Sequence, residues 1–269
     1  MTKNLLVHLK DIERSVENSN HLMLTLDLDE LWNSHPRHDF SHKKINYNIR
    51  RLAHNPFVTT VIISAGSSDN LYKEFGLKEL VYAGNYGLDI LYHGPKAMKH
   101  EVSGNRRMMH DFYQEIKNLV SSFPQLQIVD NKYSVQISLK EHEGEFPECF
   151  MLSVRKVLGK YPNLYMHHSC SVLDFKPIGF FQRGSVHARI QKLLGKSNVF
   201  GLYIGNHRMS HAKAAIHGGI KAVSIGKNKQ LFSDYHLDDL DELQIFLTWL
   251  NEVDCIKYFV PAQADFQLI

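Results

Sequence analysis

Asp27 and Asp29, two acidic residues separated by a single residue, follow the apolar run 22–26 early in the chain. Successive side chains on a strand point to opposite faces, so these two carboxylates would point the same way. One carboxylate of such a pair can attack phosphorus while the other moves a proton. Taken alone, an acidic pair at this place is also typical of a solvated strand end.

Other expected strand ends carry polar residues as well. Ser64 follows the β-branched run 58–63, and Asn206 and His207 follow the apolar run 199–205. Because open α/β sheets build their sites at the carboxyl ends of the strands, this pattern predicts a site at one edge of a sheet. Ser64 by itself is equally typical of a turn or a helix cap.

Composition is that of an ordinary globular protein, with 43% apolar residues, 22% charged residues and a net charge of +3. This small net charge predicts no nucleic-acid partner. The charge is uneven, because residues 175–233, the basic segment, contain ten Lys or Arg and no Asp or Glu. The local excess predicts an anion site within this part of the chain.

The elements that would position these residues alternate between strand and helix. Apolar strand patterns and helix patterns alternate from residue 5 to about 92 and again from about 185 to 251. This alternation predicts a parallel sheet flanked by helices. We therefore predict a core made of residues 1–92 and 172–269, with residues 93–171 inserted as an α+β cap.

In this order the motifs resemble those of the haloacid dehalogenase (HAD) superfamily, and within it the trehalose-6-phosphate phosphatase family. The resemblance runs from residue 22 to residue 250 and implies a HAD-like Rossmannoid core with an inserted cap. The family's DxDGT, SGR, YAGNHGLE, KG and YIGDDxTDEDAF motifs are similar to the segments DLDEL at 27–31, SAGS at 64–67, YAGNYGLD at 82–89, RG at 183–184 and YIGNHRMSHA at 203–212.

The resemblance implies a role for each matched residue. Asp27 would be the nucleophile that forms an aspartyl phosphate, and Asp29 would protonate the leaving sugar oxygen and then activate water. Ser64 and Arg183, which stands at the family's lysine position, would bind the phosphoryl group. Mg²⁺ would be held by Asp27, Asp29 and Asn206, the last a weak ligand.

Several positions depart from the family pattern. Glu30 and Leu31 replace the Gly and Thr of the first motif, and Asn206 and His207 replace the two Asp of the fourth. No acid in the basic segment can substitute for these aspartates. A neutral amide oxygen is a weaker Mg²⁺ ligand than a carboxylate, so we expect the metal site to be impaired or absent.

The expected cap keeps only part of the family's sugar-binding pattern. The family has an ExK pattern followed by a HYR-like triplet, and this chain has VDNK at 129–132 and SLK at 138–140. The resemblance implies that Asp130 and Lys132 contact a polyol. The His and Arg of the triplet are missing, so the identity of the sugar stays open.

The remaining reactive residues favour ordinary roles. Cys149, Cys170 and Cys255 lack CxxC spacing, which predicts neither a disulfide framework nor a zinc site. His207 and His211 have helical spacing but no third ligand, so a soft-metal site is disfavoured. The chain contains no run of about 18 apolar residues and no secretory pattern, and we therefore expect a cytoplasmic protein without a membrane partner.

Two functional hypotheses remain. The first is a divergent sugar-phosphate phosphatase, and the retained pair Asp27 and Asp29 favours it, since adjacent like charges are costly to keep without a use. The second is a pseudo-phosphatase that binds a phosphorylated ligand or a partner enzyme. The basic segment favours this second hypothesis, because a site that loses acids and keeps bases can bind an anion without metal.

Overall fold

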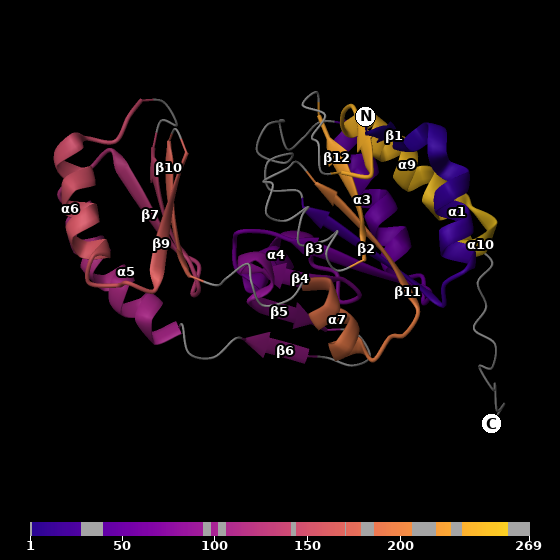
Figure 1. Ribbon diagram of the computed structural model, residues 1–269, viewed down its shortest axis with the longest axis horizontal. Helices are drawn as coiled ribbons and strands as arrows, with labels where there is room; N and C mark the ends of the chain where they lie inside the picture. Colours follow the sequence, from indigo (N-terminus) through magenta and orange to yellow (C-terminus); the bar gives the residue numbers. More distant parts are fainter. Residues whose placement is uncertain are drawn as a thin grey trace.

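The computed structural model describes residues 2–27, 40–93, 98–101, 106–140, 144–169, 171–178, 186–205, 219–226 and 233–257. The described strands form a nine-stranded sheet and a four-stranded sheet, each in its own lobe (Figure 1). The α/β class, with a largely parallel sheet flanked by helices, is confirmed. None of the described helices is long and apolar enough to cross a membrane.

The nine-stranded sheet of the larger lobe is parallel from β1 to β4, and β5 and β6 then turn back antiparallel. All seven residues of the central strand β2 are buried, as expected of a parallel strand covered on both faces. In spatial order the strands are β1 (Lys3–Asn4), β13 (Tyr235–Leu237), β12 (Lys221–Ile225), β11 (Val199–Gly205), β2 (His21–Asp27), β3 (Val58–Ile63), β4 (Val81–Gly84), β5 (Asp89–Tyr92) and β6 (Met98–Glu101).

Helices cover both faces of this sheet. Leu22, Leu24 and Leu26 of β2 pack in the same cluster as apolar residues of α1, α3, α4 and α9, while Met23 packs with Ile190 of α7 on the opposite face. The described helical elements of the lobe are η1 (Leu5–His8), α1 (Leu9–Glu17), α3 (Phe40–Ala53), α4 (Ser68–Phe75), η2 (Asn85–Gly87), α7 (Val186–Leu194), α9 (Leu240–Glu252) and α10 (Asp254–Lys257).

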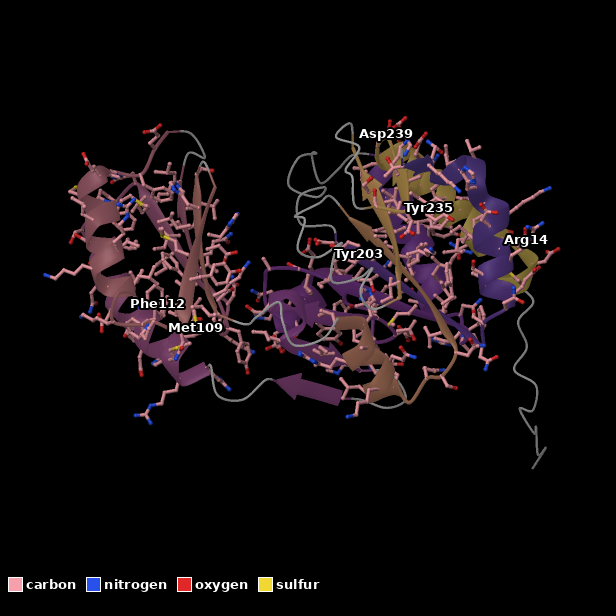
Figure 2. All side chains as sticks on the ribbon, viewed as in Figure 1. Arg14, Met109, Phe112, Tyr203, Tyr235 and Asp239 are labelled. Carbon is pink, nitrogen blue, oxygen red and sulfur yellow. The ribbon has the colours of Figure 1, made fainter. Side chains whose placement is uncertain are left out.

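The smaller lobe is an antiparallel sheet with helices on one face. Met109 and Phe112 of α5 are buried in its core (Figure 2). The helices lie on the side away from the larger lobe, so the other face of the sheet is turned toward that lobe (Figure 1). Its elements are α5 (Arg106–Val120), α6 (Glu148–Leu158) and, in spatial order, the strands β7 (Leu126–Asp130), β8 (Val135–Leu139), β10 (Val172–Pro177) and β9 (Leu164–Ser169).

Two strands fall on the other side of the expected domain boundaries, 92/93 and 171/172. The boundary at 92/93 assigns β6 to the cap, but β6 pairs with β5 in the larger sheet. The boundary at 171/172 assigns β10 to the core, but β10 pairs with β8 and β9 in the smaller sheet. Each of these strands pairs antiparallel with the strand that precedes it in the chain, β6 with β5 and β10 with β9, and so joins the sheet of that strand. The exact division stays a prediction.

Candidate functional site

Asp27 ends β2 at the carboxyl edge of the larger sheet, the edge where its parallel strands end, and is 8% exposed. The Tyr203 hydroxyl donates a hydrogen bond to Asp27 Oδ2 at 2.7 Å. Gly205 is the register partner of Asp27 on β11, and a Cβ there would lie 2.8 Å from Asp27 Cβ and 3.2 Å from the Tyr203 hydroxyl. A glycine at this position therefore leaves room for Tyr203 to hold the carboxylate.

His187 lies behind Tyr203 in the α7 layer. The two rings are 6.1 Å apart in an edge-to-face arrangement, and the imidazole is buried. Burial lowers the pKa of His187 to about 4, so the ring is neutral at pH 7. Within the described chain its Nε2 has no hydrogen-bond partner. The imidazole that packs against Tyr203 is therefore uncharged at neutral pH.

Ser64 follows β3, the strand next to β2, so it lies at the same edge of the sheet as Asp27. The side chain is 7% exposed, and Oγ accepts a hydrogen bond from the Gly66 backbone N–H at 2.9 Å. An accepting hydroxyl still carries its own proton, which suits a phosphoryl oxygen. The structure thus places two of the predicted site residues on neighbouring strands at one edge, the predicted nucleophile and one predicted phosphate ligand.

The YAGN segment, residues 82–85 at the end of β4, packs tightly against the Ser64 loop. A Cβ on Gly84 would lie 2.0 Å from the Ser68 backbone nitrogen, so no other residue fits without a shift. The Asn85 backbone N–H donates to the Gly66 carbonyl at 2.7 Å, and Asn85 has a positive φ of 48°. Close approach of two loop backbones therefore fixes the carboxyl edge beside Ser64.

The same asparagine joins the two lobes. Asn85 is fully buried; its Nδ2 donates to the Asn131 carbonyl at 2.6 Å, and its Oδ1 accepts from the Ser134 hydroxyl at 3.0 Å. Asn131 and Ser134 belong to the turn between β7 and β8, the cap turn, residues 131–134. The smaller lobe is thereby docked at the carboxyl edge of the larger sheet, where a cap over the site has to lie.

Asp130 and Lys132, the predicted sugar contacts, flank and enter this cap turn. The Lys132 ammonium forms an ion pair with Asp69 of α4, across the two lobes. Asp130 Oδ1 accepts a hydrogen bond from the Lys132 backbone N–H at 2.8 Å. Both residues therefore lie where the lobes meet, and their contact with a sugar stays a prediction.

Two lysines in the described part of the basic segment form ion pairs within the fold. Lys176 forms a buried ion pair with Asp174 on β10, and Lys221 pairs with Asp234 at 3.0 Å. Arg189 donates a hydrogen bond to the Gly87 carbonyl. The described part of this segment therefore offers less net positive charge to a ligand than its composition suggests.

With this geometry in place, comparison with known proteins is informative. A protein-family model for trehalose-phosphatase matches residues 30–213 of the chain. This chain belongs to the trehalose-phosphatase family. The matched range contains motifs two to four and starts immediately after Asp29. Among curated proteins, the probable trehalose-phosphate phosphatase H of Arabidopsis thaliana is 27% identical over 238 residues, which cover 81% of this chain and 67% of that protein. The chain spans about two thirds of the length of such relatives.

Solved structures in this family have the same fold. The C-terminal domain of C. albicans trehalose-6-phosphate phosphatase superposes with a TM-score of 0.69 at 14% identity, covering 94% of this chain and 99% of that one. The C-terminal domain of the Candida albicans trehalose synthase regulatory protein superposes with a TM-score of 0.63 at 10% identity, covering 88% and 97%. At these identities the likeness shows the shared fold alone.

Three of the residues matched to trehalose-phosphatase motifs, Asp29, Arg183 and Asn206, lie outside the described residues. So do Glu30, Leu31 and His207, other positions at which motifs one and four depart from the family pattern. Their roles stay predictions. The described chain contains no cluster of three His, Cys, Asp or Glu side chains that could hold a metal ion.

The family implies Mg²⁺, and the donor chemistry of the site can be tested against it. Mg²⁺ prefers hard oxygen ligands, and Asp27 places a carboxylate at the strand end where such a ligand is needed. Asp29 and Asn206 would add further oxygen atoms and no nitrogen or sulfur. The donor set therefore fits Mg²⁺ in type, although the fourth motif lacks both of the carboxylates that the family pattern supplies.

Sequence reasoning missed three residues that the structure places at the site: Tyr203, Asn85 and Asp69. One signal was present for Tyr203, because side chains two residues apart share a strand face and Gly205 leaves that face open. Asn85 and Asp69 act through contacts with the cap turn, 46 and 63 residues away in the chain. No local sequence pattern predicts contacts between residues so far apart in the chain.

Proposed function

We propose that this chain is a divergent sugar-phosphate phosphatase that works through an aspartyl phosphate. An Asp27 oxygen attacks phosphorus, and the bond from phosphorus to the sugar oxygen breaks. Asp29 gives its proton to the leaving sugar oxygen. Asp29 then takes a proton from water, whose oxygen attacks the aspartyl phosphate and releases inorganic phosphate, so Asp27 is regenerated.

One observation carries this proposal: the buried Asp27 carboxylate is held by Tyr203 at the carboxyl edge, one strand away from the Ser64 hydroxyl. A nucleophile held in one rotamer loses less entropy on reaching the attack geometry. Ser64 and Arg183 would bind the phosphoryl oxygens. The substrate class is a phosphorylated sugar, and trehalose 6-phosphate is its first candidate because of the family.

Mg²⁺ is the proposed cofactor, held by Asp27, Asp29 and Asn206. When bound, it would offset the charge of the phosphoryl group and of the clustered carboxylates. With an amide in place of a carboxylate, we expect binding weaker than millimolar. Metal titration by calorimetry measures this directly, and an affinity tighter than about 100 µM would contradict the proposed ligand set.

A second candidate function is that of a pseudo-phosphatase, which binds a phosphorylated ligand or a partner enzyme without turnover. The loss of both motif-four aspartates favours it. The trehalose synthase regulatory protein, whose name describes a regulatory role, has a C-terminal domain of the same fold, which supports this candidate. In that case phosphate would raise the melting temperature without metal, and Arg183→Ala would abolish the rise.

The deciding experiment is phosphate release from trehalose 6-phosphate and a panel of sugar phosphates, with and without Mg²⁺. The phosphatase proposal predicts turnover that Asp27→Asn lowers by at least about 1,000-fold, since the amide is a far weaker nucleophile than the carboxylate. Asp254→Asn, at an exposed acid on α10, is the matched control and leaves turnover unchanged. Absence of turnover on the whole panel would exclude the first candidate and favour the second.

A further inference from the structure

A cavity of about 530 Å³ lies at the amino edge of the larger sheet, where its parallel strands begin. It is lined by the first residues of β2 and β3, by the end of β5, and by the chain just after α7. Since Asp27 ends β2 and His21 begins it, the strand separates this cavity from the candidate active site. We call it the amino-edge pocket.

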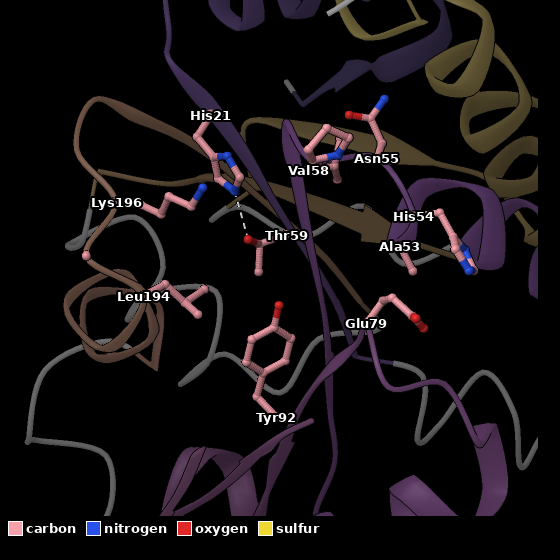
Figure 3. A pocket seen from close by; sticks show the side chains of 12 residues that line it. His21, Ala53, His54, Asn55, Val58, Thr59, Glu79, Tyr92, Leu194 and Lys196 are labelled. Carbon is pink, nitrogen blue, oxygen red and sulfur yellow. Dashed lines mark hydrogen bonds between the residues drawn. The ribbon is translucent and has the colours of Figure 1, made fainter. Parts of the chain in front are cut away.

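The pocket wall is built from paired polar groups. His21 is 4% exposed, and its Nε2 shares a hydrogen bond with the Thr59 hydroxyl at 2.7 Å. Burial, together with the nearby Lys196 charge, lowers the pKa of His21 to about 4, so the ring is neutral at pH 7. The Tyr92 hydroxyl points toward Thr59, and the Lys196 ammonium points toward His21 (Figure 3).

Charges of both signs line the pocket. Lys196 lies on one side and Glu79 lies on the other (Figure 3). Neither side chain forms an ion pair in the part of the chain that the structure describes. Burial, with the Glu79 charge as a second cause, raises the pKa of Tyr92, so the phenol keeps its proton. The pocket therefore offers one ammonium and one carboxylate, whose charges cancel, together with two hydroxyls, two imidazoles and an amide.

This chemistry selects the ligand. Sugar hydroxyls both donate and accept hydrogen bonds, so Lys196 and Glu79 can each bind one, and the Tyr92 ring can pack against a sugar face. A phosphorylated ligand would meet Glu79, which repels it. Cavities of a few hundred Å³ suit small ligands. We infer that the amino-edge pocket binds a neutral sugar or polyol of one or two rings, at a site separate from Asp27.

Calorimetric titration of the full chain with glucose and with maltose tests this inference, with inorganic phosphate and glucose 6-phosphate as the charged comparisons. We expect a neutral sugar to bind, and Glu79→Gln and Thr59→Val to weaken it by about 10-fold or more. Glu74→Gln, an exposed acid on α4, is the matched control and leaves binding unchanged. Asp27→Asn also leaves it unchanged, which separates this pocket from the candidate active site.

A second readout guards against misfolded variants. The ring-proton NMR signals of His21 are assigned from their loss in His21→Gln. In the wild-type chain, added sugar should shift these signals. No binding of either sugar at 20 mM, or equal binding by Glu79→Gln, would overturn the inference. Phosphate binding that is tighter than sugar binding and that Lys196→Met abolishes would overturn it too, because the pocket would then select anions.

Discussion

The same strand and the same helix reach both the carboxyl and the amino edge of the larger sheet, but the polar groups at the two edges are held differently. β2 runs from His21 in the amino-edge pocket to Asp27 at the candidate active site. On the same face α7 runs the other way, from His187 near Asp27 to the chain that ends at Lys196 in the pocket. One strand and one helix thus contribute to both places.

The difference lies in how the polar groups are held. At the carboxyl edge Asp27 is tied to Tyr203, and two loop backbones approach so closely that only glycine fits at position 84. At the amino edge a cavity stays open, and Lys196 and Glu79 have no ion-pair partner among the described residues. A covalent step needs reacting groups in a fixed geometry, whereas reversible binding needs polar groups in a cavity that a ligand can reach.

The largest effect that would test this comparison comes from two glycines. Gly84→Ala places a Cβ 2.0 Å from the Ser68 nitrogen, and we expect it to lower the free energy of unfolding by about 3 kcal/mol. Gly76 lies toward the amino edge, has φ of 67° and nothing within 4 Å, so Gly76→Ala should cost only about 1 kcal/mol of backbone strain. Denaturant titration measures both, and equal losses would show that close packing does not distinguish the edges.

Two tyrosines give the next effect. Tyr203→Phe removes the hydroxyl that donates to Asp27, so we expect a loss of about 2 kcal/mol in stability and a fall of roughly 10-fold in phosphate release. Tyr92→Phe, in the amino-edge pocket, removes a hydroxyl that makes no hydrogen bond to a described residue. Its free energy of unfolding should stay within about 0.5 kcal/mol of wild type, and its rate of phosphate release should be unchanged.

A double-mutant cycle sharpens the tyrosine comparison. If Tyr203 acts through the Asp27 carboxylate, its effect on stability should shrink in the Asp27→Asn background. An unchanged effect there would mean that Tyr203 matters for packing only, and the two edges would differ less than the hydrogen bond suggests.

Much of the fold follows from local pattern. The buried runs that became β2, β3 and β11 are apolar and end at polar residues, and that pattern depends on neighbouring residues alone. β6 and β10 pair antiparallel with the strands that precede them in the chain, β5 and β9, and β10 also pairs with β8, on the other side of α6 in the chain. The pairing with β8 is long-range, and no local pattern predicts it.

The candidate site shows the same division. Asp27 and Ser64 were predictable, because polar residues at strand ends stand out against an apolar run. Tyr203 has the residue type and spacing of a core aromatic, and only its hydroxyl contact with Asp27 reveals a second role. The amino-edge pocket was not predictable, because His21, Thr59 and Lys196 come from segments far apart in the chain.

Each edge also holds one buried neutral histidine, which leads to a pH prediction. The pKa values of His187 and His21 are lowered to about 4 from 6.5, so the unfolded chain binds their protons first as the pH falls. Stability is therefore full above about pH 6.5 and is lost toward pH 4, by about 1–2 kcal/mol per histidine at pH 5. Denaturant titrations at pH 7 and pH 5 should show less loss in His187→Phe and in His21→Gln.

A sugar titration also distinguishes the edges. Bound sugar should raise the free energy of unfolding of the wild-type chain by mass action on the folded state, and should raise that of Glu79→Gln less, because the pocket is weakened there. If sugar protects Glu79→Gln equally, it binds elsewhere, and the amino edge would have no site of its own.

The smallest expected effect concerns two lysines. Lys132 pairs with Asp69 across the lobes, with the side chains 29% and 36% exposed, so solvent screens much of the attraction. Lys132→Met should therefore cost only about 0.5 kcal/mol and roughly double the hydrogen-exchange rate of the Tyr133 amide, which bonds to the Asn131 carbonyl in the cap turn. Lys196→Met removes a lysine that has no ion-pair partner among the described residues, and stability should be unchanged. If instead Lys132→Met leaves Tyr133 exchange at the wild-type rate, Asn85 alone docks the cap turn, and the carboxyl edge is held by its buried hydrogen bonds without help from surface charge.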